Sequence, residues 1–193
     1  LSLSSADPEL EHVITDAQVD RIIAPEDSLA KLRPLCDRLS TPLLSVDEVS
    51  AQQSVPLPRV EDGRRAMILY TSGTTSKPKG VVSTHDNIQA QITTLAEAWG
   101  WRSDDSIPLF LPLHHVHGIV NVLGCALWSG ARADCFDSFD AAAILGRVAD
   151  KQYSVFMGVP TIYVKLIRIL EAADETDRAR YADGFAHMRL MVS

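Results

Sequence analysis

The stretch AMILYTSGTTSKPKG at residues 66–80 joins a short apolar run to a loop rich in hydroxyls, lysines and glycines. The apolar part, residues 66–71, stops at a glycine-containing turn, which is typical of a buried strand. In the loop, glycine lets the backbone approach a ligand closely, and consecutive N–H groups can form a nest for an anion. Hydroxyls and lysines add donors for phosphate oxygens. The stretch therefore predicts a strand followed by a loop whose composition fits a polyphosphate.

The loop does not follow the Walker A pattern of P-loop nucleotide-binding proteins. That pattern would need glycine where Pro78 stands and a hydroxyl residue where Gly80 stands. A P-loop kinase or GTPase is thus disfavoured. Composition alone leaves open an ordinary surface turn rich in serine and threonine. The order of the residues has to decide between the two interpretations.

In its order, YTSGTTSKPKG resembles the signature of the adenylate-forming superfamily, which includes acyl-CoA synthetases, peptide-synthetase adenylation domains and luciferases. The usual form is YTSGTTGxPKG, and the departure is Ser76, where serine narrows the backbone freedom of the usual glycine. The resemblance implies ATP, Mg²⁺ and coenzyme A, with Lys79 as a catalytic residue that neutralises charge or anchors the loop. The nucleotide-binding residues that it implies are Thr71, Ser72, Gly73, Thr74, Thr75, Ser76, Lys77, Pro78 and Lys79.

A cluster of histidines, PLHHVHG at residues 112–118, is the second chemically distinctive segment. His114 and His117 have a short spacing that metal ligands can show. No third Cys, His, Asp or Glu stands at a convincing distance, so the sequence predicts no metal site. Histidines that meet backbone or water at the start of a helix remain an alternative.

The same segment resembles the PLxHxxG motif of the superfamily, with His115 at the motif histidine and therefore implied to be catalytic. The longer string LPLHHVHGIVN resembles malonyl-CoA and methylmalonyl-CoA synthetases of the acyl-CoA synthetase family member 3 type. A dicarboxylate carries a second anion that needs a donor, which His117 or His114 could supply. The substrate-binding residues implied here are His114, His115 and His117.

The string VFMGVPTIYVKL at residues 155–166 resembles the segment that lines the acyl pocket in the same superfamily. The resemblance implies substrate contacts from Met157, Gly158 and Val159. A plain buried strand followed by a helix that starts at Pro160 explains the pattern equally well. Both interpretations stay open at this point.

Strand and helix signals alternate beyond the loop, which predicts an α/β fold with a layered, mostly parallel sheet flanked by helices. By resemblance this is part of the large N-terminal domain of an adenylate-forming enzyme. Helices are expected at residues 86–99, ended by Gly100, at 115–128, after an N-cap at Asp140, and from Pro160. Strands are expected at residues 19–24, 66–71, 106–111, 133–136 and 155–157, and from Leu190.

Composition narrows the class of protein further. The chain has 193 residues and a net charge of −7, which disfavours nucleic acid and anionic membrane as partners. Three cysteines without a CxxC pair favour a reducing compartment. No apolar run is long enough to span a bilayer, and no secretory signal stands at the start. We expect a soluble intracellular protein, cytoplasmic or in the mitochondrial matrix.

These observations together predict a partial N-terminal AMP-binding domain at residues 1–193, without the C-terminal domain. Residues 1–63 are expected to be peripheral, ending in a connector at 52–63, and residues 64–193 to form the phosphate-loop core. The full-length parent is expected to activate a carboxylic acid, malonate or methylmalonate, through an acyl-adenylate and pass it to coenzyme A. The fragment alone is expected to be inactive. The alternatives are another acyl or aryl acid–CoA ligase, or a noncatalytic truncated nucleotide-binding module.

Overall fold

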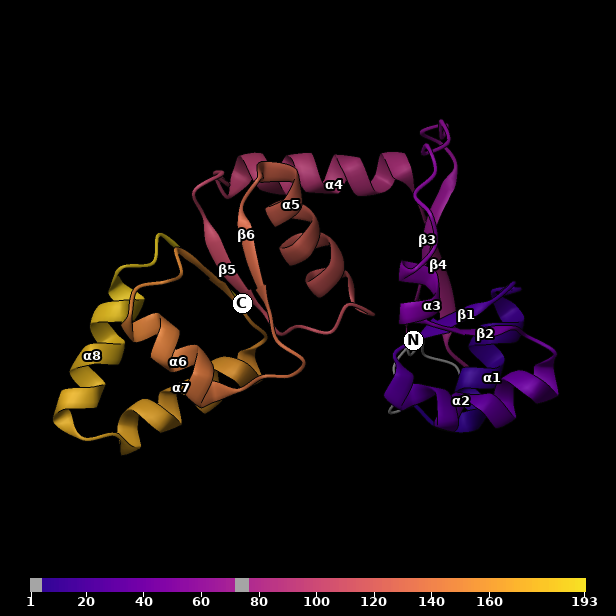
Figure 1. Ribbon diagram of the computed structural model, residues 1–193. Coiled ribbons are helices and arrows are strands. Elements are labelled where there is room, and N and C mark those ends of the chain that lie inside the picture. Colours follow the sequence, from indigo (N-terminus) through magenta and orange to yellow (C-terminus); the bar gives the residue numbers. More distant parts are fainter. Residues whose placement is uncertain (1–4, 72–76) are drawn as a thin grey trace. The chain divides into compact units, whose positions relative to one another are not determined.

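The structure is a computed structural model that describes residues 5–71 and 77–193. It divides into two compact units, Leu1–Asp86 and Asn87–Ser193, each of which is described by itself (Figure 1). The first unit contains α1 (Asp7–Asp16), β1 (Ile22–Ala24), α2 (Glu26–Leu39), β2 (Leu43–Ser45), α3 (Val46–Ser50), β3 (Arg65–Thr71) and β4 (Lys79–Thr84).

The core of the first unit lies between two helices and a short parallel pair of strands. Strands β1 and β2 pair in parallel from Ile22 opposite Leu43 to Ala24 opposite Ser45. Helix α2 ends at Ser40, whose left-handed backbone (φ 53°) stops the helix before β2. Buried apolar side chains of α1, β1 and α2 form the hydrophobic core of this unit, made of Leu10, Ile14, Ile22, Ala24, Leu32, Leu35 and Cys36.

Strands β3 and β4 form an antiparallel hairpin, with Tyr70 opposite Gly80 and Thr71 opposite Lys79. The strand expected at residues 66–71 is therefore confirmed. The expectation that it is buried is wrong, because every residue of β3 is exposed or half-buried. An apolar run indicates a strand, but a strand whose only partner strand among the described residues is β4 has its faces only partly covered. The connector expected at residues 52–63 is confirmed as exposed chain without a helix or strand.

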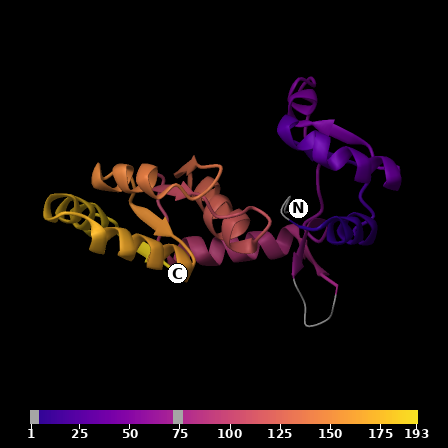
Figure 2. The same ribbon diagram turned by 90° about the horizontal axis from the view of Figure 1, so that it is seen from below.

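The second unit contains α4 (His85–Ala98) from its third residue onward, β5 (Ser106–Leu109), the π-helix η1 (His117–Gly124), α5 (Cys125–Ser129), β6 (Arg132–Cys135), α6 (Ala141–Ala149), β7 (Val155–Met157), α7 (Pro160–Ala172), α8 (Glu175–Ala186) and β8 (Leu190–Val192). Strand β5 pairs in parallel with β6, and β7 pairs in parallel with β8. Figures 1 and 2 show the helices of this unit around these strands.

The two strand pairs are joined through β5 and β7. The N–H of Ser154, just before β7, donates to the carbonyl of Ser106 at the start of β5 (3.1 Å). At the other end, the rings of Phe110 and Phe156 lie 5.6 Å apart. Because both ends correspond, β5 and β7 run in the same direction. The predicted α/β fold with a mostly parallel layer is confirmed.

Local signals account for most helix boundaries. Gly100, the second residue after α4, has a positive φ of 58°, as the predicted stop requires. The Asp140 side chain accepts a hydrogen bond from the N–H of Ala143 (3.0 Å), which confirms it as the N-cap of α6. The helix expected at residues 115–128 is present, but its first part is a π-helix, which the hydrophobic pattern did not indicate.

The beginnings of the strands are fastened by a buried carboxylate. Asp105, 3% exposed, accepts hydrogen bonds from Ser154 Oγ (2.6 Å), from the Arg102 N–H (2.8 Å) and from two guanidinium nitrogens of Arg189. Burial alone would raise the pKa of Asp105, but the hydrogen bonds from Arg189, Ser154 and the Arg102 backbone outweigh it and lower the pKa below 3.8. The residues directly before β5, β7 and β8 are thus held at one point.

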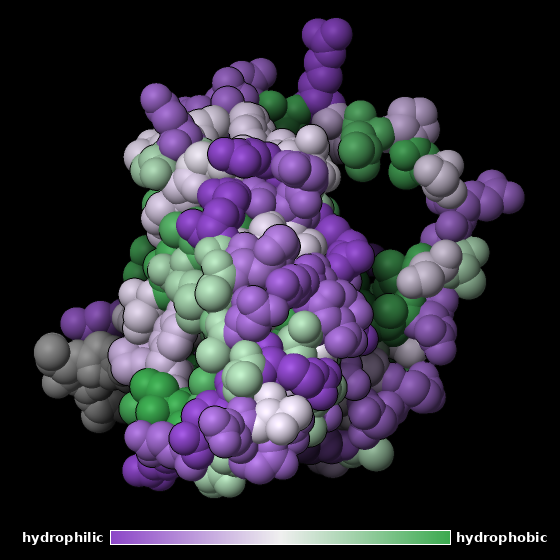
Figure 3. Space-filling view, turned by 90° about the vertical axis from the view of Figure 1, so that its left-hand side faces the viewer, coloured by the Kyte–Doolittle hydropathy of each residue, from purple (hydrophilic) through white to green (hydrophobic). Residues whose placement is uncertain are grey.

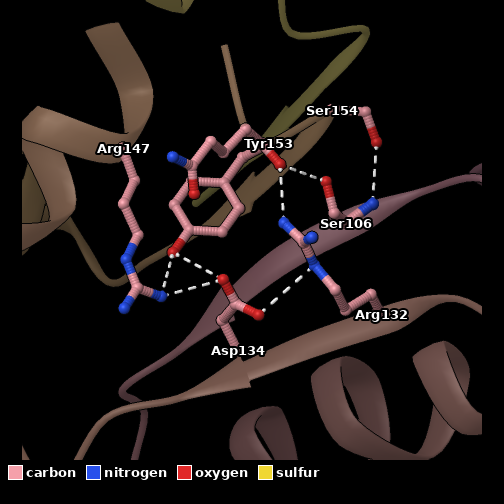
Figure 4. Close-up of polar contacts among 7 residues, drawn as sticks. Ser106, Arg132, Asp134, Arg147, Tyr153 and Ser154 are labelled. Carbon is pink, nitrogen blue, oxygen red and sulfur yellow. Dashed lines mark hydrogen bonds and ion pairs between the residues drawn. The ribbon is translucent and has the colours of Figure 1, made fainter. Parts of the chain in front are cut away.

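A second polar cluster lies across β6 and the turn between α6 and β7 (Figure 4). Asp134 Oδ2 accepts from Arg147 Nη1 (2.9 Å) and from the hydroxyl of Tyr153 (3.2 Å), while Arg132 Nε lies 3.3 Å from Oδ1. The ring of Tyr153 is 1% exposed, so its hydroxyl reaches the surface layer from inside the core. The cluster thereby joins the strand layer to α6.

The outer side of the second unit is polar. The face with α8 carries mostly hydrophilic side chains (Figure 3), and exposed pairs such as Lys151 with Asp183 (2.8 Å) connect α8 to the turn before β7. Glycine permits the tight packing beneath, because a Cβ on Gly184 would lie 2.2 Å from the Val148 carbonyl oxygen of α6. Within the described chain, no helix is both long and apolar enough to cross a bilayer.

Candidate functional site

The described ends of the signature loop come from the β3–β4 hairpin. Thr71 ends β3 and Lys79 begins β4 directly opposite it, and both are exposed, as is Lys77. Pro78 is half-buried between the two lysines. The remaining predicted nucleotide-binding residues lie outside the described residues; they are Ser72, Gly73, Thr74, Thr75 and Ser76.

The first and last residues of the signature face each other across the hairpin. Tyr70 and Gly80 are register partners, and a Cβ on Gly80 would lie 3.0 Å from Cζ of the Tyr70 ring. Glycine therefore leaves the space that the tyrosine ring occupies on that face. The Tyr70 hydroxyl donates to Asp16 Oδ2 at the end of α1 (2.6 Å). Burial together with this carboxylate raises the pKa of Tyr70 to about 12.

A second contact from α1 reaches the other end of the loop. His12 Nε2 lies 3.0 Å from the carbonyl oxygen of Pro78, a distance at which the ring N–H donates to the carbonyl. Sequence reasoning missed both His12 and Asp16. The partners are 66 and 54 residues apart in the chain, and neither residue belongs to a local motif.

The predicted histidines lie in the turn that follows β5 and in the first residue of the π-helix. The rings of His114 and His115 lie 4.4 Å apart, and His115 is the more exposed of the two. Burial, together with the neighbouring His115, lowers the pKa of His114. His115 donates its backbone N–H to the Pro112 carbonyl (3.2 Å), which closes the turn. The turn therefore presents His115 outward.

His117 begins η1 and is half-buried. Its Nε2 atom is buried and has no hydrogen-bond partner within the described part of the chain. Burial lowers the pKa of His117 and so favours the uncharged form of the ring. The next residue explains the glycine of the PLxHxxG motif, because a Cβ on Gly118 would lie 2.5 Å from the Pro112 carbonyl oxygen. Only glycine lets the π-helix start this close to the turn.

The residues predicted to line the acyl pocket follow β7. Met157 is fully buried, and Gly158 is buried with its N–H donating to the Val192 carbonyl (3.1 Å). Val159 is 40% exposed and precedes α7. Of these three residues, only Val159 offers an exposed side chain in this structure.

The histidine turn and the Met157–Val159 segment leave the same edge of the strand layer. Strands β5 and β7 are neighbours with the same direction, so both segments follow carboxyl ends of adjacent parallel strands. Ligands of open α/β sheets bind at such edges. No group of three His, Cys, Asp or Glu side chains in residues 5–71 and 77–193 is arranged to hold a metal ion.

Comparison with known proteins defines the class. The chain belongs to the family of AMP-binding enzymes, whose model matches residues 1–193. It is 40% identical over 201 residues to human "Malonate--CoA ligase ACSF3, mitochondrial", covering 96% of this chain and 34% of that protein. It is 33% identical over 215 residues to "Malonate--CoA ligase" of Arabidopsis thaliana, covering 100% of this chain and 35% of that protein.

Solved structures agree with this assignment. A malonyl-CoA ligase ternary product complex with methylmalonyl-CoA and AMP bound matches with a TM-score of 0.86 and 34% identity, covering 100% of this chain and 40% of that one. Apo MatB from Rhodopseudomonas palustris matches with a TM-score of 0.84 and 25% identity, covering 100% and 38%. The chain thus spans about a third of the length of the curated relatives that it matches.

Proposed function

We propose that the full-length protein to which this chain belongs is an ATP-dependent acid–CoA ligase that acts on malonate or methylmalonate. One carboxylate oxygen of the acid attacks the α-phosphorus of ATP, and the bond to the β-phosphate oxygen breaks to release pyrophosphate. The sulfur of coenzyme A then attacks the acyl carbonyl carbon, and the bond to AMP breaks. The thiol proton leaves to solvent, and the products are AMP and the acyl-CoA thioester.

The observation that carries this proposal is the family match over the whole chain together with relatives named as malonate–CoA ligases. The hairpin geometry agrees with it, because Thr71 and Lys79 face each other where the signature loop leaves the strands. The chain covers about a third of those relatives, so the activity is proposed for the longer protein.

We assign the nucleotide's β- and γ-phosphates to the signature residues, with hydroxyl and backbone N–H donors from Thr71 to Ser76. Preorganised donors stabilise the charge that develops on the leaving pyrophosphate. Lys79 begins a strand and is held by the register with Thr71, so it is proposed to neutralise phosphate charge. Lys77 and Pro78 are proposed to complete the nucleotide-binding segment. Mg²⁺ is proposed as a companion of the phosphates, and we assign it no ligand among the described residues.

We assign the acid to the edge where β5 and β7 end. His115, which the turn exposes, is proposed as the catalytic histidine of the acid site. Nε2 of His117 has no hydrogen-bond partner among residues 5–71 and 77–193, and together with His114 this residue is proposed to offer a donor to the second carboxylate of a dicarboxylic acid. Met157, Gly158 and Val159 are proposed to form the wall of the acyl pocket.

The test is acid-dependent ATP–pyrophosphate exchange by the full-length protein. Malonate and methylmalonate should stimulate exchange, whereas acetate and octanoate should stimulate it far less. Lys79→Ala should reduce exchange by about 10²-fold or more, as loss of one transition-state donor does. Lys77→Ala, a matched loss of charge two residues away, should reduce it less. Stimulation by acetate or octanoate without any by malonate would reject the substrate assignment.

We also propose that the protein works inside the cell, in the cytoplasm or the mitochondrial matrix. The name of the human relative includes the word mitochondrial, and the name of the Arabidopsis relative gives no location. Subcellular fractionation with a tagged full-length protein tests this. Recovery of the protein from the culture medium would contradict it.

A further inference from the structure

Helix α1 packs against the core with one face and carries polar side chains on another. Leu10 and Ile14, four residues apart, are both 2% exposed and belong to the core cluster of the first unit. His12 and Asp16, also four residues apart, lie on another face, since positions i and i+4 share one side of a helix. The helix is therefore fixed to the core on one side and offers two polar side chains on the other.

These two polar side chains contact opposite ends of the signature loop. Asp16 Oδ2 accepts from the Tyr70 hydroxyl (2.6 Å), directly before the loop. His12 Nε2 lies 3.0 Å from the Pro78 carbonyl oxygen, near the other end of the loop. The His12 and Tyr70 rings also meet edge to face, with centroids 6.4 Å apart. Figure 2 shows α1 beside the β3–β4 hairpin, and both contacts lie at the loop end of that hairpin.

Gly80 is part of the same arrangement. A Cβ there would lie 3.0 Å from Tyr70 Cζ and 3.2 Å from its hydroxyl oxygen. The tyrosine ring can therefore lie over Gly80 and carry its hydroxyl to α1. Because Gly80 has no side chain, the Tyr70 ring has room to reach Asp16 with its hydroxyl.

Holding a loop at both ends restricts its conformations more than holding it at one end does. A loop whose ends are already held loses less conformational freedom when it binds a ligand, and this improves affinity without adding a contact to the ligand. The contacts to Tyr70 and Pro78 bracket the segment to which we assign the ATP phosphates. Their effect should therefore fall on nucleotide binding.

We propose that His12 and Asp16 of α1 are positioning residues that hold the two ends of the phosphate-binding loop in the arrangement that receives the polyphosphate of ATP. This role rests on the proposed function, because it takes the loop to be the phosphate site. Neither residue is required to touch the nucleotide.

The experiment uses the full-length protein and the variants His12→Ala, His12→Gln and Tyr70→Phe. The dissociation constant of ATP is measured by calorimetry without acid, and KM for ATP, KM for malonate and kcat by pyrophosphate exchange. Loss of one hydrogen bond should weaken ATP binding about three- to tenfold in His12→Ala and in Tyr70→Phe. KM for malonate and kcat at saturating ATP should stay near wild type. His12→Gln keeps an N–H donor and should recover most of the affinity.

Glu11→Gln is the matched control, because Glu11 precedes His12 on α1 but pairs with Arg38 of α2 (2.8 Å). It removes a contact of the same helix that does not lead to the hairpin, and ATP affinity should not change. Unchanged ATP affinity in both His12→Ala and Tyr70→Phe, even with a lowered melting temperature, would overturn the proposal. Weaker binding in Glu11→Gln to the same degree would overturn it as well.

The two proposals fail in different ways. If wild-type protein binds ATP but shows no exchange with any acid, the proposed reaction fails, and the calorimetric comparison of variants still decides the positioning role. If exchange is normal and the variants bind ATP like wild type, the positioning role alone fails. Absence of ATP binding by the wild-type protein would overturn both.

Discussion

Two carboxylates, Asp105 in the second unit and Asp16 in the first, hold strands in opposite ways. Asp105 is buried and receives hydrogen bonds from Ser154, Arg102 and Arg189, which gather the beginnings of three strands. Asp16 is exposed and accepts a side-chain hydrogen bond from Tyr70, beside the loop end of a hairpin. A buried carboxylate needs several partners to offset its lost hydration, whereas an exposed one does not.

This difference between the two carboxylates indicates that one serves the stability of the fold and the other the binding of a ligand. The network around Asp105 lies at the amino ends of the strands, away from the edge that carries the histidine turn. The contacts of α1 lie at the loop to which we assign ATP. Binding segments belong to parts of proteins with less burial, while cores supply most of the stability. We therefore expect Asp105 to govern folding and the α1 contacts to govern ligand affinity.

The largest expected effect follows from Asp105→Ala. The change leaves the Arg189 guanidinium, 24% exposed, without its carboxylate partner. Breaking a buried pair in this way costs about 3–5 kcal/mol of unfolding free energy. Urea denaturation measures it, with exposed Asp137→Asn in the same unit as the control, expected within about 0.5 kcal/mol of wild type. A loss of unfolding free energy below about 1 kcal/mol would contradict the expectation that Asp105 governs folding.

The pH dependence of stability tests the same pair in the wild-type protein. The folded-state pKa of Asp105 lies below its ordinary value of 3.8, because the hydrogen bonds from Arg189 and its neighbours outweigh the burial that would raise it. Its contribution is therefore present above pH 3.8 and is lost as the pH falls through the folded pKa. The stability difference between wild type and Asp105→Ala should shrink below pH 3.8. A difference that stays constant from pH 7 to pH 3 would contradict this.

Gly118→Ala should have an intermediate effect. The new methyl would lie 2.5 Å from the Pro112 carbonyl oxygen, so the histidine turn and the π-helix must separate. Such overpacking costs about 1–3 kcal/mol. Gly146→Ala is the matched control in helix α6, where no atom lies within 4 Å of the new carbon. It should be stabilising by about 0.4–1 kcal/mol. Thermal melting separates the two, and equal melting temperatures would refute the steric role of Gly118.

The smallest expected effects come from the two tyrosine hydroxyls. Tyr153→Phe removes a hydroxyl from a ring that is 1% exposed and should cost about 1 kcal/mol, because Asp134 loses one of its donors. Tyr70→Phe removes an exposed contact and should cost less than that. Denaturation curves of both variants rank them. A larger stability loss from Tyr70→Phe would show that the hairpin contact is structural rather than positional.

Much of the fold could be predicted because its signals are local. The cap at Asp140, the positive φ at Gly100 and the proline at the start of α7 each depend on a few adjacent residues. The strand at residues 155–157 was expected with the bounds that the structure has. Helix α8 was not predicted, because its few apolar residues form a weak pattern in a polar segment.

In the candidate site, too, local motifs could be predicted from the sequence, whereas their tertiary surroundings could not. The order YTSGTTSKPKG and the motif around His115 indicated the family from the sequence alone, and the match over residues 1–193 agrees. The assignments of single residues to ATP or to the acid stay predictions. The exposure of β3 was misjudged, because an apolar run reports a strand but not which partners cover it.

The sequence by itself determined the family, the alternation of strands and helices, and the glycines of both motifs, since each depends on residue types in a short order. Tertiary structure decided why two of those glycines are needed, because the Tyr70 ring at Gly80 and the Pro112 carbonyl at Gly118 are found only in the folded chain. It also decided that Asp105 meets Arg189, and that His12 and Asp16 meet the ends of the signature loop. Contacts between residues 54 to 84 positions apart leave no local pattern, so folding alone brings them together.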